Sequence, residues 1–131
     1  MRLPLLQVRD LRIGFQNEDV VKGISFNLDL GEKLALVGES GSGKSVTALS
    51  FVKLLEGARV TGRVLWTAQD EDTLRPDATD APHTHDLVKL SERELINIRG
   101  QDIAFVFQEP MTALNPLMMV GDQIAEVLEL K

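Results

Sequence analysis

The chain has 131 residues, of which 44% are hydrophobic and 26% charged, with a formal net charge of −6 and no cysteine. The missing cysteines exclude a disulfide framework and a thiolate metal site, and no apolar run reaches the roughly 18 residues that a membrane span needs. The N-terminal residues lack the apolar core of a signal peptide, and basic residues form no stripe typical of nucleic-acid binding. We therefore expect one cytoplasmic domain that binds no nucleic acid.

Three strands are predicted before residue 38. Residues 8–13 read as a strand with a break in phase near Asp10. Residues 24–30 alternate apolar and polar side chains, which is typical of an antiparallel strand with one solvent-exposed face. The chain then turns at Gly31 into the continuous apolar run of residues 34–37, which predicts a buried parallel strand.

The next segment matches the phosphate-binding pattern G-x-x-x-x-G-K-[ST] at every fixed position, as Gly38-Glu39-Ser40-Gly41-Ser42-Gly43-Lys44-Ser45. Glycines let backbone N–H groups approach phosphate oxygens closely. Lys44 supplies a charge for the β- and γ-phosphates, and the Ser45 hydroxyl is a Mg²⁺ ligand. Residues 46–55 read as a helix whose positive end points at the same anion. Strand, loop and helix together favour a phosphate cradle over a flexible turn that carries a surface lysine.

A short strand and an acidic loop are predicted after this helix, which Gly57 closes. The strand covers residues 63–66. Residues 67–86 contain six acidic residues and one arginine, and they are rich in Asp, Thr, Pro and Ala. Such a composition predicts a solvated, mobile loop that carries most of the net charge.

The acidic loop contains the lone pair His83 and His85. A metal site with Asp80 or Asp86 as third ligand is one interpretation of this His-x-His. We favour a solvated loop, because nothing in the sequence fixes the geometry of the ligands.

Three further elements complete the chain as a mixed α/β domain. Ser91 and Glu94 have the spacing of a capping box, so a helix is expected to begin there. Residues 103–107 are a second continuous apolar run and predict a second buried strand. The pair Asn115-Pro116 marks a turn, and a final helix is expected over residues 121–130.

With these motifs in view, the chain resembles the nucleotide-binding subunit of an ABC transporter, in the subfamily that imports peptides and nickel. The resemblance covers residues 5–131 apart from the acidic segment. It rests on the stretches 38–47, 90–100 and 105–116, and the last of these (Phe-Val-Phe-Gln-Glu-Pro-Met-Thr-Ala-Leu-Asn-Pro) is the most diagnostic. It implies an α/β fold with a P-loop NTPase core and an antiparallel β subdomain. Residues 1–131 would then be a partial nucleotide-binding domain, with 67–86 as an insertion and a helical subdomain beginning near 117–131.

The resemblance also implies roles for matched residues. Gln108 takes the place of the Q-loop glutamine, which senses Mg²⁺ and the γ-phosphate and couples that site to the transmembrane partner. A neutral amide suits this role because it both donates and accepts hydrogen bonds. Lys44 and Gln108 would act in catalysis, and Ser45 and Gln108 would hold Mg²⁺. The implied nucleotide contacts are Gly38, Glu39, Ser40, Gly41, Ser42, Gly43, Lys44, Ser45, Val46 and Phe15.

Two groups of apolar residues carry open alternatives. Phe15, 23 residues before Gly38, stands where the family places an adenine-stacking aromatic, although a core phenylalanine explains it equally well. Val21 would flank the adenine in the same way. Met111, Met118 and Met119 lie where the family places the coupling helix of the permease, and methionines suit a surface that moulds to a moving partner. Core filling is the alternative for them.

Several groups that phosphoryl transfer requires are absent from the sequence. No apolar run ends in Asp-Glu, no Leu-Ser-Gly-Gly-Gln occurs, and no histidine follows such a strand. We expect the N-terminal half of a domain whose parent is an import ATPase, bound to permeases and a second nucleotide-binding domain on the inner face of the membrane. The chain itself is expected to bind ATP without turnover and, because its sheet is incomplete, to self-associate or to be unstable.

Three other functional classes are alternatives. One is a non-catalytic fragment that binds nucleotide or a partner, which can hold for this chain while the import ATPase holds for its parent. A small-molecule kinase or GTPase is a second, but the chain has no Asn-Lys-x-Asp and no Asp-x-x-Gly after the second strand. A soluble ABC ATPase of DNA repair is a third, and it lacks the continuation from Gln108 to Pro116.

Overall fold

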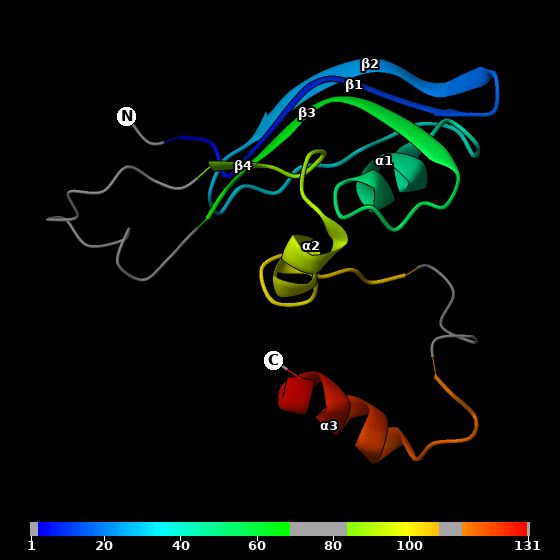
Figure 1. The fold of residues 1–131 in the computed structure, drawn as a ribbon, viewed down its shortest axis with the longest axis vertical. Coiled ribbons are helices and arrows are strands. Elements are labelled where there is room, and N and C mark those ends of the chain that lie inside the picture. The colour runs from blue at the N-terminus through cyan, green and yellow to red at the C-terminus, as the bar shows by residue number, and fades with distance from the viewer. Residues whose placement is uncertain (1–2, 69–83, 108–113, 131) are drawn as a thin grey trace, which may run out of the picture. The chain divides into compact units, whose positions relative to one another are not determined.

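The computed structural model describes residues 3–68, 84–107 and 114–130. In these ranges the chain forms β1 (Leu6–Phe15), β2 (Glu18–Leu28), α1 (Lys44–Ser50), β3 (Ala58–Thr67), β4 (Thr84–Asp86), α2 (Glu92–Ile98) and α3 (Val120–Leu130) (Figure 1). The chain divides into two compact units, residues 1–91 and 92–131, which are described separately below. None of the helices in the described ranges is long and apolar enough to cross a bilayer.

One antiparallel sheet, with strands in the order β2-β1-β3-β4, forms the first unit. The central strand β1 pairs with β2 from Leu6 opposite Leu28 to Phe15 opposite Glu18, and on its other side with β3. The three strands predicted at residues 8–13, 24–30 and 63–66 therefore exist. Each extends further than the sequence pattern indicates at its N-terminal end, because pairing with a neighbour adds residues that alternation alone does not mark.

The phase break near Asp10 is a β-bulge. Asp10 has a φ of 47°, and the register of β1 shifts between Val8 and Leu11. On the neighbouring strand Gly62 has a φ of 98°, and a Cβ there would lie 2.4 Å from the Asp10 carbonyl oxygen. The extra residue keeps Val8 and Leu11 on the same face, and both side chains are 0% exposed.

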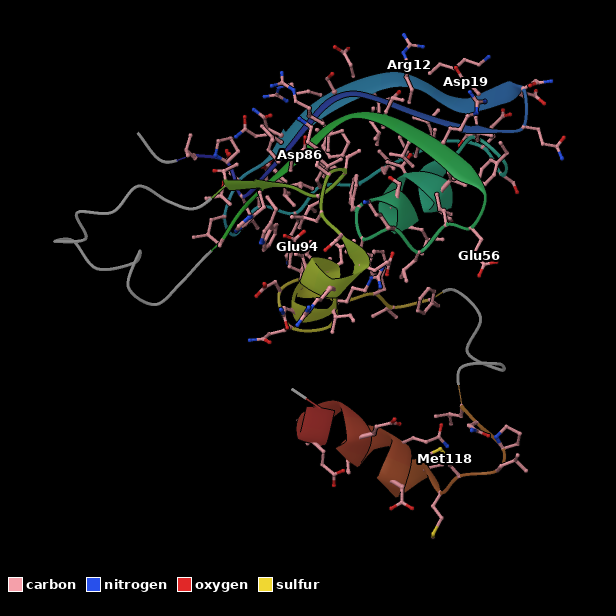
Figure 2. All side chains as sticks on the ribbon, viewed as in Figure 1. Arg12, Asp19, Glu56, Asp86, Glu94 and Met118 are labelled. Atoms are coloured by element: carbon pink, nitrogen blue, oxygen red, sulfur yellow. The ribbon has the colours of Figure 1, made fainter. Side chains whose placement is uncertain are left out.

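The core of the first unit lies between the sheet and α1, and Figure 2 shows Arg12 on the opposite side of the sheet. The Phe26 ring of β2 packs against Phe51, directly after α1, with ring centroids 6.4 Å apart. The buried hydrophobic residues of this unit are Leu6, Val8, Leu11, Ile13, Val21, Val52, Val64, Trp66 and Leu87. Most lie on β1 and its two neighbours, so this face of the sheet fixes the position of α1 and of the loop before it.

Two of the predicted strands do not form. Residues 32–39 and 104–107 have no regular secondary structure, and Leu34, Val37 and Phe107 are 43%, 87% and 63% exposed. A parallel strand is stable only when neighbouring strands take its hydrogen bonds and other elements cover both of its faces. Among the described residues no strand pairs with either segment. The prediction of buried strands at 34–37 and 103–107 is therefore wrong for this structure.

Two further boundaries differ from expectation. The helix predicted over residues 46–55 is α1 at Lys44–Ser50, and it gives way to a turn in which Lys53 has a φ of 53°. Both ends of the loop predicted over 67–86 belong to strands, because Thr67 is the last residue of β3 and residues 84–86 form β4, with Asp86 opposite Leu65. Residues 69–83 lie outside the described ranges.

The second unit contains α2 and α3. As expected, α2 begins directly after Ser91, and it buries Leu95 and Ile98. Arg99 joins the end of α2 to its start through an ion pair with Glu92 at 2.9 Å. The turn predicted at Asn115-Pro116 and the final helix are both present, the helix beginning one residue earlier than expected.

Candidate functional site

The phosphate-loop residues 38–45 connect an extended segment to α1. Gly41 and Gly43 have φ values of 81° and 97°, a left-handed conformation that side-chain-bearing residues rarely adopt. The backbone N–H of Ser42 donates to the Glu39 carbonyl at 3.1 Å and closes the turn. The glycines predicted from the motif thus stand where the chain turns most sharply.

The loop rests against β2. A Cβ at Gly43 would lie 2.9 Å from Cγ2 of Val21 and 3.4 Å from Cγ1 of Val20. A glycine is therefore required at position 43 for two reasons: a Cβ would clash with Val21, and the backbone angle is left-handed. Val21 is only 5% exposed, so its side chain packs under the loop and is not accessible to an adenine ring. Val20 was not singled out from the sequence, because its contact joins β2 to a loop more than twenty residues away.

The Lys44 side chain folds over the loop. Its ammonium group donates to the carbonyl oxygens of Gly38 and Glu39, the latter at 2.8 Å. The cation therefore lies beside the turn whose N–H groups would receive a phosphate. The Ser45 residue is exposed, whereas the Thr47 hydroxyl is buried and donates to the Gly43 carbonyl at 2.7 Å. Of these two hydroxyls, Ser45 is the one accessible to a ligand.

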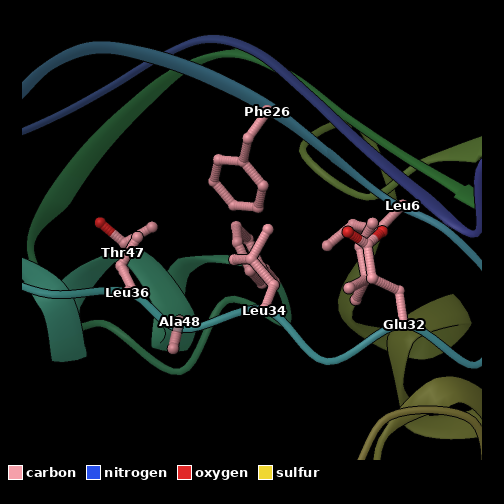
Figure 3. A pocket seen from close by; sticks show the side chains of 9 residues that line it. Leu6, Phe26, Glu32, Leu34, Leu36, Thr47 and Ala48 are labelled. Carbon is pink, nitrogen blue, oxygen red and sulfur yellow. The ribbon is translucent and has the colours of Figure 1, made fainter.

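An apolar cavity of about 240 Å³ lies between the sheet, the extended segment that precedes the loop, and α1 (Figure 3). Its lining residues are Leu6, Phe26, Leu28, Glu32, Leu34, Leu36, Thr47, Ala48 and Phe51. The Glu32 carboxylate accepts a hydrogen bond from the Asp29 N–H at 2.7 Å, and the Thr47 hydroxyl is bonded as above. The two polar side chains that line the cavity are thus already hydrogen-bonded within the protein, so the cavity has few free polar groups for a polar ligand. It lies beside Leu34 and Leu36, which were expected to pack within a sheet.

Phe15 and His85 were also singled out from the sequence, and the structure describes both. Phe15 ends β1, half-buried, opposite Glu18. Gln108, Met111 and His83 lie outside the described ranges. His85 is exposed on β4, and the described residues hold no cluster of three or more His, Cys, Asp or Glu side chains suited to a metal.

Comparison with known proteins places the chain in a family. The protein-family model described as "ABC transporter" matches residues 21–129. The oligopeptide transport ATP-binding protein OppD of Bacillus subtilis is 44% identical over 131 residues, which cover 95% of this chain and 32% of that protein. The glutathione import ATP-binding protein GsiA of Salmonella typhimurium is 43% identical over 133 residues, covering 96% and 20% respectively.

A third relative, the peptidoglycan transport ATP-binding protein YejF of Agrobacterium fabrum, is 44% identical over 134 residues, covering 97% of this chain and 22% of its own length. The chain therefore spans about a fifth to a third of the length of the curated relatives it matches. Because the family model covers most of the chain, and because its phosphate loop has the geometry described above, this protein belongs to the ABC transporter family.

Proposed function

We propose that this chain is part of the ATP-binding subunit of an ABC importer, which couples ATP binding and hydrolysis to the uptake of peptides or a similar small solute. The observation that carries the proposal is the loop of residues 38–45, with its two left-handed glycines and the Lys44 ammonium beside the turn. The names of three relatives, which describe transport of oligopeptide, peptidoglycan and glutathione, support the solute class.

The loop would bind the triphosphate of ATP through residues 38–46. The left-handed conformation of Gly41 and Gly43, which turns the backbone of the loop sharply, supports a cradle made of backbone N–H groups. On binding, the Lys44 ammonium would leave the carbonyls of Gly38 and Glu39 for the β- and γ-phosphates. This exchange replaces neutral acceptors by a charged one, and charge-assisted hydrogen bonds are the stronger kind.

Mg²⁺ is the metal that the donor set suits. The exposed Ser45 hydroxyl is a hard oxygen ligand, and the amide oxygen of Gln108 would be a second. Bound there with ATP, the ion would neutralise charge on the phosphate oxygens. Phe15 would stack on the adenine from the end of β1. The role of Gln108 rests on the resemblance of the stretch 105–116 alone.

The partners of the whole protein would be two kinds of chain. Transmembrane permease subunits would receive the motion through the loop of Gln108, and a second nucleotide-binding domain would close over the two nucleotides. These partners would hold the protein on the inner face of the cell membrane. In this arrangement residues 1–131 are a partial nucleotide-binding domain, 67–86 an insertion, and 117–131 the start of the helical subdomain.

Nucleotide binding without turnover is expected of this chain by itself. Hydrolysis needs a carboxylate that holds the metal and a group that orients the attacking water. The sequence has no apolar run that ends in Asp-Glu and no Leu-Ser-Gly-Gly-Gln. The cradle alone positions phosphate but supplies neither group.

Titration calorimetry with MgATP tests the proposal. The variant Lys44→Ala should abolish saturable binding, whereas Lys33→Ala, which removes an exposed lysine eleven residues earlier, should leave the dissociation constant unchanged. Phosphate release, followed in parallel, should stay at background. Binding that survives in Lys44→Ala would contradict the assigned cradle, and turnover by the unmodified chain would contradict the account of the missing groups.

A further inference from the structure

The face of the sheet that points away from α1 is basic. Figure 2 shows Arg12 on this side. Because side chains of a strand alternate between the two faces, a residue paired with Arg12, or two positions away from it, lies on the same side. The cations that the strand register places there, named here the basic face, are Arg9 and Arg12 of β1, Lys22 of β2, and Arg59 and Arg63 of β3.

The bulge at Asp10 brings Arg9 to the same face as Arg12. The two arginines are three positions apart in the chain, so in a regular strand their side chains would point to opposite faces. The extra residue of the bulge restores the phase, and Arg9 then lies opposite Arg63 on β3. The bulge thus gathers on one face cations that a regular strand would divide between two.

Like charges lie opposite each other across two of the strand pairs. Arg12 is paired with Lys22, and Arg9 is paired with Arg63. Directly opposed like charges destabilise a sheet. The exposed cations Arg12, Lys22 and Arg63 have no ion-pair partner among the residues that the structure describes. An anion bound between the opposed cations would remove this repulsion.

The acids on or beside the basic face do not balance its charge. Asp19 forms an ion pair with Arg59 at 3.7 Å, and the Asp86 carboxylate accepts a hydrogen bond from the Val64 N–H at 3.3 Å. A third acid, Asp10, lies in the bulge. The cations outnumber these acids by five to three, although the whole chain has a net charge of −6. The basic face is therefore a local excess of positive charge on an acidic protein.

An extended acidic peptide matches the spacing of the basic face. In an extended chain, side chains two residues apart point the same way and lie about 7 Å apart. Successive rows of the basic face have the same interval, since Arg12 and Gly14, which is paired with Arg59, are two residues apart on β1. Acidic side chains at alternate positions of a peptide that runs along the strands would therefore meet successive rows of cations.

Two larger kinds of anion fit this face less well. Proteins that bind single-stranded nucleic acid use aromatic side chains on which the bases stack. The uncharged side chains that the register places beside the cations include no aromatic ring: they are Gln7, Ser25, Asn27, Thr61 and Leu65. An anionic membrane or a long polyanion would also meet the acids on the rest of the chain, whereas a short peptide can place its charge on this face alone.

We propose that the basic face binds an extended peptide that carries Asp or Glu at alternate positions. The attraction is between exposed charges, so binding is weak and depends strongly on salt. It does not use the phosphate loop, which lies with α1 on the other side of the sheet (Figure 1). This interaction is therefore independent of the proposed function.

Fluorescence anisotropy with a labelled peptide of alternating Glu and Thr tests the proposal. The unmodified chain should bind it at low ionic strength and should ignore the same peptide with Lys in place of Glu. A peptide of equal composition with its glutamates in adjacent pairs, which puts them on both sides of an extended chain, should bind several-fold less tightly. Binding should disappear at about 1 M salt, where screening acts beyond about 3 Å. Binding that survives this salt, or equal binding of the three peptides, would overturn the proposal.

Charge reversal on β2 separates binding from folding. Lys22→Glu should abolish peptide binding and yet raise the urea midpoint, because an opposed pair of like charges becomes a pair of opposite charges. Lys33→Glu makes the same change of charge on the exposed segment before the phosphate loop and should leave binding unchanged. Arg63→Ala should weaken binding about two- to fivefold, the range for one exposed ion pair, and it decides the matter if Lys22→Glu fails to fold. Unchanged binding in these two variants of the basic face would overturn the proposal.

Other occupants of the face and the nucleotide site give distinct results. Tighter binding of single-stranded RNA or of anionic vesicles than of the peptide would overturn the proposed partner. Peptide binding that appears only after Asp70, Glu71 and Asp72 are replaced by the corresponding amides would identify the chain's own acidic segment as the occupant and would also overturn it. Lys44→Ala should bind the peptide as the unmodified chain does, so a failure of nucleotide binding leaves this inference intact.

Discussion

Replacing Gly43 by alanine tests whether the phosphate loop is fitted against the sheet. Gly43 precedes α1 with φ 97° and ψ 12°, and an added Cβ would lie 2.9 Å from Val21 Cγ2. The left-handed conformation costs a non-glycine residue about 1–2 kcal/mol. Crowding a buried neighbour adds about 1–3 kcal/mol, because Val21 is enclosed and has little room to move. We expect Gly43→Ala to lower the free energy of unfolding by about 2–5 kcal/mol in total.

A matched control separates the two contributions. Gly41 has a φ of 81°, but a Cβ at that position meets nothing within 4 Å. Gly41→Ala should therefore show the backbone cost alone, about 1–2 kcal/mol. The excess destabilisation of Gly43→Ala over Gly41→Ala measures the contact with Val21.

The assay is urea unfolding of the whole chain, followed by the fluorescence of Trp66, a buried residue of β3 in the same unit. Adding Val21→Ala to Gly43→Ala should recover part of the loss, with a coupling energy of about 1–2 kcal/mol. The reasoning fails if Gly43→Ala and Gly41→Ala are equally destabilising, or if the double variant shows no coupling.

The other predictions concern the bulge and the exposed extended segment. Gly62→Ala places a Cβ 2.4 Å from the Asp10 carbonyl oxygen, so it should destabilise the sheet more than Gly43→Ala does. A urea midpoint equal to that of the unmodified chain would refute the bulge. Val37 is 87% exposed within an apolar run, so the unmodified chain should self-associate in sedimentation velocity and Val37→Lys should shift it toward monomer. A sharp monomer peak for the unmodified chain at all concentrations would contradict this second prediction.

Features that depend on neighbouring residues in the chain were predictable from the sequence. The glycine-rich loop was marked by its fixed spacing, and the antiparallel strand at residues 24–30 by its alternation. The helix after Ser91 was marked by its capping residues, and the turn at Asn115 by the following proline. In each case the cause lies within a few residues, so the pattern carries the information.

Features that depend on distant residues were decided by the tertiary structure. The apolar runs at 34–37 and 103–107 are compatible with buried strands, but a strand needs hydrogen-bonded neighbours. Among the described residues no named strand pairs with either run, and Ile103 forms only an isolated bridge with Arg99. The contact of Gly43 with Val21 also escaped sequence reasoning, because no local pattern marks the partner of a glycine. The sequence by itself determined the family and the phosphate loop. Only the folded chain decided what supports that loop and which apolar segments stay exposed, because both depend on contacts between residues far apart in the chain.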